Sequence, residues 1–434
     1  MNARIAAQLP PHQLPEFQRA ARIMLRSPLV TSSTPEAFAL VRRWEQVLGN
    51  EFGQKLGYRL DVSRTSARLL RRPASLSSHR GARLPNGRRM SRWAYVYFAL
   101  VLAALEQPGQ QVLASELLDR IVQRGRGDER LALDSREYAQ RKAFSDAVRY
   151  LEHIGVLTVR DGDVDTIVDE GQVLFDVDRD AAAMCLVASP SILRDVTCVG
   201  DFIAAPATGS MESRRRDARQ RLNRRLIDQA VVTVDDLDDD EYLLAWRNRR
   251  READNIARLT GCDVELRAEG MALVDVNVEP ISGSRFPGND SVAHAALLWL
   301  DRLVAALTEP GSSIDDLVFD PHHSITDDEP SDGISFDDAV IDRPPTDAVR
   351  RLPRRDAIGV WDEMFAEYGS RFAAAARERP DRFRDQCAEL LARFGLVRWE
   401  GSDVLVVAAA ARFRAVASLP APRARDLNQQ ELFR

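Results

Sequence analysis

The sequence is poor in lysine and in cysteine. Its only lysines are Lys55 and Lys142, so arginine supplies nearly all of the positive charge. The four cysteines stand far apart and include no CxxC pair. This spacing argues against a disulfide framework or a zinc site and favours a reducing environment. Arginine suits contact with phosphate, because its planar guanidinium can donate two hydrogen bonds to one phosphate group.

No hydrophobic run is long enough to cross a membrane. The most apolar stretch, Ala94 to Leu105, is about twelve residues long and suits a buried helix, whereas a bilayer span needs about 20 residues. The first residues, Met1 to Ile5, lead into polar, proline-containing sequence rather than a secretory signal. We therefore expect a cytoplasmic protein with no membrane partner.

Motifs of common catalytic and cofactor sites are also missing. The sequence contains neither GxxxxGK[ST] nor GxGxxG, the glycine-rich loops that hold phosphates. His322 and His323, with Asp320 and Asp327, are a weak metal-site candidate that a solvated linker explains better. Six acidic residues within Asp235–Glu241 precede a predicted helix, whose N-terminus carboxylates stabilise. We predict no catalytic residue, no metal and no cofactor.

Negative charge is concentrated in one stretch. Ser312 to Ala348 carries eleven acidic residues and one basic residue, Arg343, whereas the whole chain has a net charge of −6. The rest of the chain therefore carries a net charge of +4. Because this acidic stretch contains several prolines and little periodicity, we expect a disordered insertion, or one that a partner orders.

Apolar periodicity predicts a mostly α-helical chain with small β-hairpins, in the α+β class. A first helix is predicted over Leu14–Arg26, and a second begins at Thr34–Pro35 and ends at Gly57. Alternating apolar residues from Tyr58 to Val62 predict a strand, with its return at Ala67–Leu70. These elements form a helix–helix–hairpin module.

The next elements have the order of a winged helix. A connection over Pro73–Met90, rich in serine, glycine and arginine, is predicted to be a linker. Helices are then predicted over Trp93–Leu105, Leu113–Gln123 and Asp134–Ile154, followed by a hairpin within Val156–Val177. Three helices followed by a hairpin are typical of the winged helix, a variant of the helix-turn-helix.

The second half of the chain repeats this order. RRLIDQAVVT (Arg224–Thr233) resembles RIMLRSPLVT (Arg22–Thr31), and AALTEPG (Ala305–Gly311) resembles AALEQPG (Ala103–Gly109). The stretch LARFGLVRWEGSDV from Leu391 has the same form as LEHIGVLTVRDGDV from Leu151. Each match is short, but their common order predicts an internally duplicated, tandem winged-helix architecture.

These repeats and composition changes predict the domain limits. The predicted parts are an N-terminal helix–helix–hairpin module (1–72), a basic linker (73–90), a first winged helix (91–200), a second helix–helix–hairpin module (211–280), a second winged helix (288–420) with an acidic insertion (312–348), and a C-terminal tail (421–434). The tail contains Gln429, Leu432 and Phe433, spaced as in the short peptides that dock on sliding clamps; a tail that packs on a partner subunit is the simpler interpretation.

Two arginine clusters are the candidate DNA-binding residues. One precedes and enters the first winged helix, and the other opens the second half of the chain. The candidates are Arg80, Arg83, Arg88, Arg89 and Arg92 in the first cluster, and Arg214, Arg215 and Arg216 in the second. Such clusters can follow the DNA backbone without reading its sequence. The alternative is a solvated charged surface that acidic residues balance.

Several stretches together resemble a known family. FQRAARIMLRSPLVT, EFGQKLGYRLDV, ARLLRRPA, YLEHIGVL and LLARFGLVRWEGSDV resemble the MukE-like subunit of type II Wadjet, a bacterial plasmid-defence complex built on an SMC ATPase. The resemblance extends from about Pro15 to Ala415 and does not include the acidic insertion.

The resemblance implies a non-enzymatic KITE protein, which is a tandem winged-helix protein that binds a kleisin. It implies a homodimer that grips the kleisin and helps to hold DNA, without sequence preference, against the SMC subunits. ATP hydrolysis would belong to the SMC ATPase, and plasmid cleavage to a topoisomerase-like nuclease that this chain contacts only indirectly. The resemblance supplies no DNA-binding residues, so the arginine candidates depend on charge clustering alone.

Two other functions stay open at this point. A stand-alone winged-helix transcription regulator would insert a recognition helix into the major groove. In the second repeat, the corresponding helix carries Asp381, Asp385 and Glu389 beside its arginines, which suits DNA poorly. A metal-dependent nuclease would cut DNA by itself in the presence of Mg²⁺.

Overall fold

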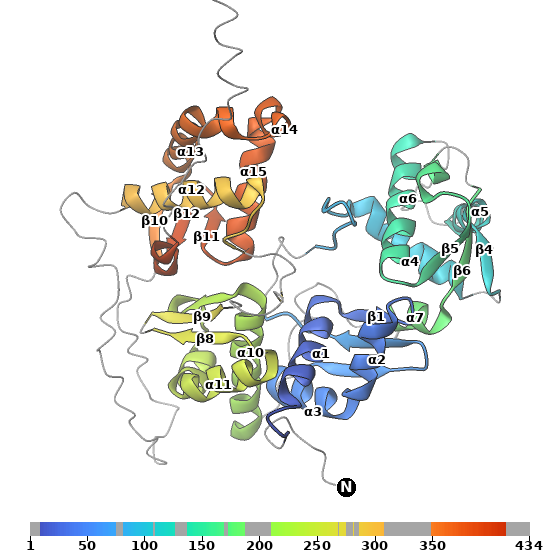
Figure 1. Ribbon diagram of the computed structural model, residues 1–434, viewed down its shortest axis with the longest axis horizontal. Coiled ribbons are helices and arrows are strands. Elements are labelled where there is room, and N and C mark those ends of the chain that lie inside the picture. The colour runs from blue at the N-terminus through green and yellow to red at the C-terminus, as the bar shows by residue number, and fades with distance from the viewer. Residues whose placement is uncertain are drawn as a thin grey trace, which may run out of the picture. The chain divides into compact units, whose positions relative to one another are not determined.

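The computed structural model describes residues 9–74, 81–106, 109–125, 137–168, 172–186, 210–267, 269–274, 281, 286–307 and 349–413. The described chain is mostly helical and contains four three-stranded antiparallel sheets (Figure 1). The predicted fold class, mostly α with small β elements, is therefore confirmed. The chain divides into two compact units, one made largely of residues 1–284 and one made largely of residues 285–434.

The first unit begins with a small helix-and-sheet module. Its helices are α1 (Leu14–Arg26), α2 (Pro35–Arg43) and α3 (Glu45–Leu56), and its strands are β1 (Leu29–Thr31), β2 (Arg59–Val62) and β3 (Ser66–Leu70) in the order β1-β3-β2. The single helix predicted from Thr34 to Gly57 is broken at Trp44, whose backbone has φ −101° and ψ 10°. The break turns the indole of Trp44 onto Phe17 at a centroid distance of 6.0 Å, so core packing overrides the continuous pattern.

Three helices and a second sheet follow. The helices are α4 (Arg92–Leu105), α5 (Ala114–Gly125) and α6 (Tyr138–His153), and the strands are β4 (Gln111–Leu113), β5 (Leu157–Asp161) and β6 (Leu174–Val177) in the order β4-β6-β5. A 3₁₀ helix (Val164–Val168) and the short helix α7 (Arg179–Met184) complete this body. The Ser91 hydroxyl accepts a hydrogen bond from the Ala94 amide and so starts α4, as an N-cap residue does.

The first two bodies share one hydrophobic core. Leu29 of β1 belongs to the same buried cluster as Tyr97, Phe144 and Val156 of the second body. At their junction, Gly155 closes α6 with φ +78° and lies directly against the hydroxyls of Thr31 and Ser33, so that a side chain at this position would collide with them. Thr65 also donates a hydrogen bond to the Asp178 carboxylate.

A third body has the same strand order as the first. It contains α10 (Met211–Gln229), α11 (Arg249–Thr260), β7 (Val231–Thr233), β8 (Asp263–Leu266) and β9 (Gly270–Val274), in the sheet order β7-β9-β8. The helix predicted to follow the acidic stretch Asp235–Glu241 is not a regular α-helix throughout, because its first turns are a π-helix (Glu241–Ala245) and a 3₁₀ helix (Trp246–Asn248). The Glu241 carboxylate is fully buried and binds Arg225 of α10, and this contact accompanies the irregular winding.

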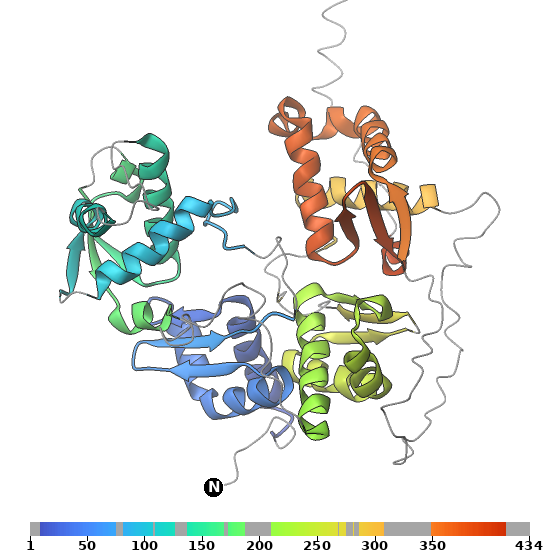
Figure 2. The same ribbon diagram turned by 180° about the vertical axis from the view of Figure 1, so that it is seen from behind.

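The first and third bodies lie side by side, with α1 and α3 facing α11 and α10 (Figures 1 and 2). Matching side chains connect them. Gln18 and Arg22 of α1 donate hydrogen bonds to the carbonyls of Arg258 and Thr260 at the end of α11. In the opposite direction, three residues of α10 donate to the end of α3. These contacts are Gln220 to Gly53, Asn223 to Lys55 and Arg224 to Leu56.

Each of these helix ends closes on a glycine in the left-handed region. Gly57 follows α3 with φ +66°, and Gly261 follows α11 with φ +73°. A Cβ atom would lie 2.5 Å from Gln220 Oε1 at Gly57 and 2.8 Å from Gln18 Oε1 at Gly261. Glycine therefore satisfies two requirements at both positions, the backbone conformation and the close approach of the glutamine.

The second unit has an aromatic core. Its helices are α12 (Ser291–Leu307), α13 (Arg354–Tyr368), α14 (Ala374–Glu378) and α15 (Pro380–Arg393), and its strands are β10 (Val349–Pro353), β11 (Val397–Glu400) and β12 (Asp403–Val407) in the order β10-β12-β11. Trp299 and Trp361 meet edge to face at 5.1 Å, and Trp299 donates a hydrogen bond to the Ala357 carbonyl. The acidic insertion 312–348 and the tail 421–434 lie outside the described residues.

Candidate functional site

The predicted arginines of the first cluster have different environments. Arg80 lies outside the described residues. Arg83 and Arg89 face each other across an isolated antiparallel bridge, and Arg83 donates a hydrogen bond to the Gly87 carbonyl. Arg88 forms an ion pair of 2.5 Å with Asp146 of α6, and the Asp146 side chain is only 5% exposed. Arg83, Arg88 and Arg89 therefore help to hold the connection 81–90 in its folded conformation.

Arg92 differs from the others in the first cluster. It is exposed in the first turn of α4, and no acidic residue among those described pairs with it. The buried residues Leu84, Met90 and Ala94 pack together just before it and fix the start of the helix. Of the first cluster, Arg92 is thus the arginine best placed for a partner in solution.

The second cluster forms the first turns of α10. Arg214, Arg215 and Arg216 are all exposed, and Arg214 pairs with Asp240 at 2.7 Å. Further along α10, Arg221 and Arg225 bind acidic residues of the Asp235–Glu241 stretch, at 3.1 Å to Asp238 and 2.9 Å to Glu241. Much of the positive charge of α10 is consequently balanced within the fold.

The acidic stretch before α11 caps a helix, as predicted. The Asp238 carboxylate accepts a hydrogen bond from the Glu241 amide, and the Glu241 carboxylate accepts one from the Asp238 amide. This reciprocal pair is a capping box. Because Glu241 is also bound by Arg225, these carboxylates have a structural role.

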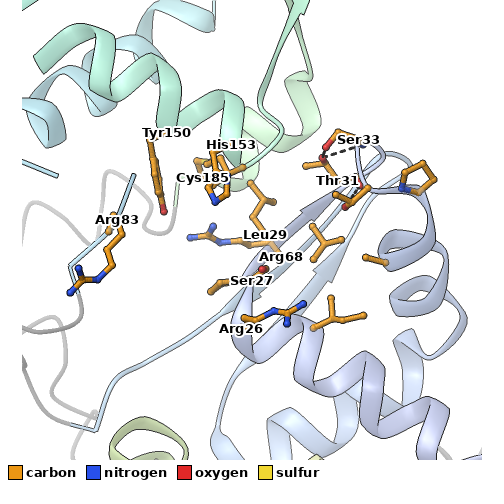
Figure 3. Close-up of a pocket in the computed structure, with 18 of the residues that line it drawn as sticks. Arg26, Ser27, Leu29, Thr31, Ser33, Arg68, Arg83, Tyr150, His153 and Cys185 are labelled. Carbon is orange, nitrogen blue, oxygen red and sulfur yellow. Dashed lines mark hydrogen bonds between the residues drawn. The ribbon is translucent and has the colours of Figure 1, made fainter. Parts of the chain in front are cut away.

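The structure brings Arg83 together with three arginines that the sequence had not singled out. Arg19, Arg26, Arg68 and Arg83 line a pocket of about 1180 Å³ between the first body and the second (Figure 3). His153 at the end of α6 adds a fifth basic side chain, and Glu36 is the one acidic residue among the described residues of the lining. The pocket therefore has a strongly basic lining.

Arg68 occupies the middle of this pocket. It lies on β3 opposite Leu29 of β1, and its side chain extends toward Tyr150 and His153 of α6 (Figure 3). Its Nε atom is buried without a hydrogen-bond partner, and no carboxylate of the described residues pairs with its guanidinium. Arg68 is half-buried, and a partly desolvated charge without a counter-ion is costly, because its lost hydration is not replaced.

The rest of the lining is hydroxyl-bearing, aromatic and apolar. The hydroxyls of Thr31 and Ser33 lie 2.6 Å apart at one side. Phe98 and Tyr150 meet edge to face at 5.7 Å at another, and the Tyr95 hydroxyl accepts a hydrogen bond from the Ala82 amide. The pocket thus combines hydrogen-bond donors with a wall on which a flat apolar group could pack.

Burial changes the acidity of two groups in the lining. Desolvation raises the pKa of the Tyr150 phenol, and the nearby Arg68 charge opposes that rise. Desolvation also raises the pKa of the Cys185 thiol to about 11, again against the influence of Arg68. Both groups are therefore neutral near pH 7, and Tyr150 can donate a hydrogen bond.

The sequence contains a partial signal for this pocket. Arg68 falls in a short strand, ARLL, whose alternation points its neighbours Ala67 and Leu69 into the core and Arg68 to the opposite face. Because β1 was not predicted from the sequence, nothing indicated which element lies beside Arg68 on β3. The partner helix α6 lies about 80 positions away in sequence, so only the tertiary fold brings the two together.

The described ranges contain no group of three His, Cys, Asp or Glu residues that could hold a metal ion. The candidate His322–His323 lies outside these ranges. In the same ranges, no helix is both long and apolar enough to cross a membrane.

The Cys185 thiol provides a test of the buried side of the pocket. At pH 8 a thiol of pKa about 11 is about 0.1% thiolate, against about 10% at its usual pKa near 9. Alkylation of native Cys185 by iodoacetamide should be at least about a hundredfold slower at pH 8 than in the urea-unfolded chain. Below pH 10 its rate should rise about tenfold per pH unit, measured by mass spectrometry of the Cys185 peptide. A rate that levels off below pH 9 would contradict the buried environment.

Comparisons with known proteins give one match. No curated protein and no solved structure matches the chain. One family model matches residues 21–416, which include most of both units and all of the arginine-lined pocket except Arg19. The chain therefore belongs to the family described as protein of unknown function DUF2398.

Proposed function

We propose that this chain is a non-enzymatic, MukE-like KITE subunit of a type II Wadjet SMC complex. In this role it binds the kleisin, forms a homodimer and helps to hold circular plasmid DNA near the SMC ATPase. Cleavage of the plasmid belongs to the topoisomerase-like nuclease subunit. The proposal extends the sequence resemblance, which covers nearly the same residues as the DUF2398 family.

The observation that carries the proposal is the recurrence of two kinds of body in the same order. In the first kind of body, the sheets β1-β3-β2 and β7-β9-β8 have the same strand order, with the last strand in the middle. In the second kind, the sheets β4-β6-β5 and β10-β12-β11 match each other in the same way. In both members of the second kind, a three-helix core precedes the two strands that would form the wing. We interpret these bodies as two winged helices in a duplicated chain, each preceded by a helix–helix–hairpin module.

The charges favour phosphate contact over recognition of base sequence. In the second unit, Arg384 of α15 pairs with Asp381 at 3.0 Å, and Arg393 lies 4.0 Å from Glu389. A helix whose arginines are balanced by its own acidic residues is poorly suited to the major groove, which argues against a stand-alone regulator. Exposed arginines such as Arg92 and Arg216 instead suit the DNA backbone, which requires no exact geometry.

The kleisin interaction is tested by co-expression of this chain with the kleisin of the same complex. We expect a complex that stays intact through affinity and size-exclusion steps, with two copies of this chain. Purification of the two as separate proteins that do not associate would contradict the proposal.

The DNA contact is tested with a variant that replaces Arg92 and Arg216 by glutamine. Each lost phosphate contact should reduce the slope of log K against log salt by about 0.9, so the double variant should lose up to about 1.8. Binding to a random duplex is measured by fluorescence anisotropy between 50 and 200 mM NaCl. Arg43→Gln is the control, because Arg43 is exposed but already pairs with Glu16 at 2.7 Å.

An unchanged slope in the double variant would place the DNA contact elsewhere on the chain. Tight binding to one operator sequence at physiological salt would favour the transcription regulator instead. Mg²⁺-dependent cutting by the isolated chain would contradict its assignment as a non-enzymatic subunit.

A further inference from the structure

We infer that the arginine-lined pocket between β1, β3 and α6 is a binding site for a nucleotide phosphate. This inference does not depend on the function proposed above. It concerns a concave site in one compact unit, whereas the proposed DNA contact uses exposed arginines.

The first step of the argument is the uncompensated charge of Arg68. Its guanidinium is half-buried, its Nε atom has no hydrogen-bond partner, and no described carboxylate pairs with it. In the same unit, the partly buried Arg71 contrasts with it, because Arg71 pairs with Asp228 at 2.7 Å and donates to the Leu25 carbonyl. Arg68 thus has the environment of a residue that an anionic ligand completes.

The second step concerns the chemical class of the anion. Arg68 extends toward Tyr150 and His153, whereas Arg83 and the Thr31–Ser33 pair lie at opposite ends of the lining (Figure 3). The guanidinium, the phenol and the imidazole around Arg68 offer more donors than the two oxygens of a carboxylate use well. A terminal phosphate presents three oxygens and accepts several charge-assisted hydrogen bonds, so it fits this set better.

The third step concerns the rest of the ligand. The pocket volume of about 1180 Å³ is far larger than a phosphate ion needs and slightly exceeds the usual range of small-molecule sites, about 300 to 1,000 Å³. Phe98 and Tyr150 form an aromatic wall, and Ile23, Leu40 and Met90 add apolar surface. Aromatic and apolar surfaces beside arginine suit a flat base attached to a phosphate.

Two sources supply this chemistry, a free nucleotide and the 5′-phosphorylated end of a DNA strand. Both present a terminal phosphate on a nucleoside, so the pocket would recognise the same group in either. The experiment separates the two sources.

The test uses the full chain and isothermal titration calorimetry with adenosine 5′-monophosphate. We expect this nucleotide to bind at least tenfold more tightly than adenosine or inorganic phosphate alone. Arg68→Met should weaken its binding at least tenfold while leaving the melting temperature unchanged or higher, because the variant removes an uncompensated charge. Arg64→Met, an exposed arginine of the same hairpin outside the pocket, should bind as the wild type does.

A second variant keeps the inference testable should Arg68→Met fold poorly. Tyr150→Phe retains the aromatic wall and removes the hydroxyl donor, so it should weaken nucleotide binding severalfold at unchanged melting temperature. Single-stranded oligonucleotides with a 5′-phosphate or a 5′-hydroxyl then separate the sources. Arg68-dependent preference for the 5′-phosphate assigns the strand end, and binding of the free nucleotide alone assigns the mononucleotide.

Three results would overturn the inference. They are no binding of the nucleotide, equal binding by wild type and Arg68→Met, and displacement of the nucleotide by an acidic, leucine-containing peptide that binds more tightly. The last result would make the pocket a docking site for a protein segment. None of these results bears on kleisin co-purification, so the function proposed above stands or falls separately.

Discussion

The structure of the first unit depends on a reciprocal capping of helix ends. Arg22 donates to the Thr260 carbonyl at 2.5 Å, and Arg224 donates to the Leu56 carbonyl at 3.0 Å. The last carbonyls of a helix lack partners within it, so each module satisfies the end of a helix in the other. A cationic side chain at a helix C-terminus also interacts favourably with the helix dipole. This exchange of hydrogen bonds explains why the first and third bodies pack together in one compact unit.

The packing of these two modules also positions the two surfaces to which we assign function, the arginine-lined pocket and the exposed start of α10. Pairing of the modules fixes α1 and the sheet containing β3, and thereby one wall of the arginine-lined pocket. It also fixes α10, so that Arg216 is exposed while Arg224 is buried in the interface. Charge is thus divided by position along one helix: arginines near its start face solvent, and those near its end hold the fold. A function built on phosphate contacts needs both sets.

The sequence predicted the helices and hairpins well where local pattern determines them. The predicted helix Leu14–Arg26 is α1, and the helix predicted from Trp93 differs from α4 by one residue. The predictions were wrong where tertiary contacts determine the backbone conformation. Trp44 breaks a continuous helical pattern, and buried Glu241 accompanies the π-helix before α11. The pocket was missed for the same reason, because Arg68 and α6 come together only through core packing. The repeated QRAAR at Gln18 and QRLNR at Gln220 contain the residues that pair the two modules, so the sequence does carry a signal for this contact.

The central claim, that the two modules cap each other, is tested most directly by hydrogen–deuterium exchange of two variants. Arg22→Met should increase exchange at the C-terminal turn of α11, more than 200 residues away in sequence, and leave the end of α3 largely protected. Arg224→Met should have the opposite effect, exposing the end of α3 and sparing α11. Exchange changes confined to the helix that carries each substitution, or equal in both modules, would contradict the reciprocal interface.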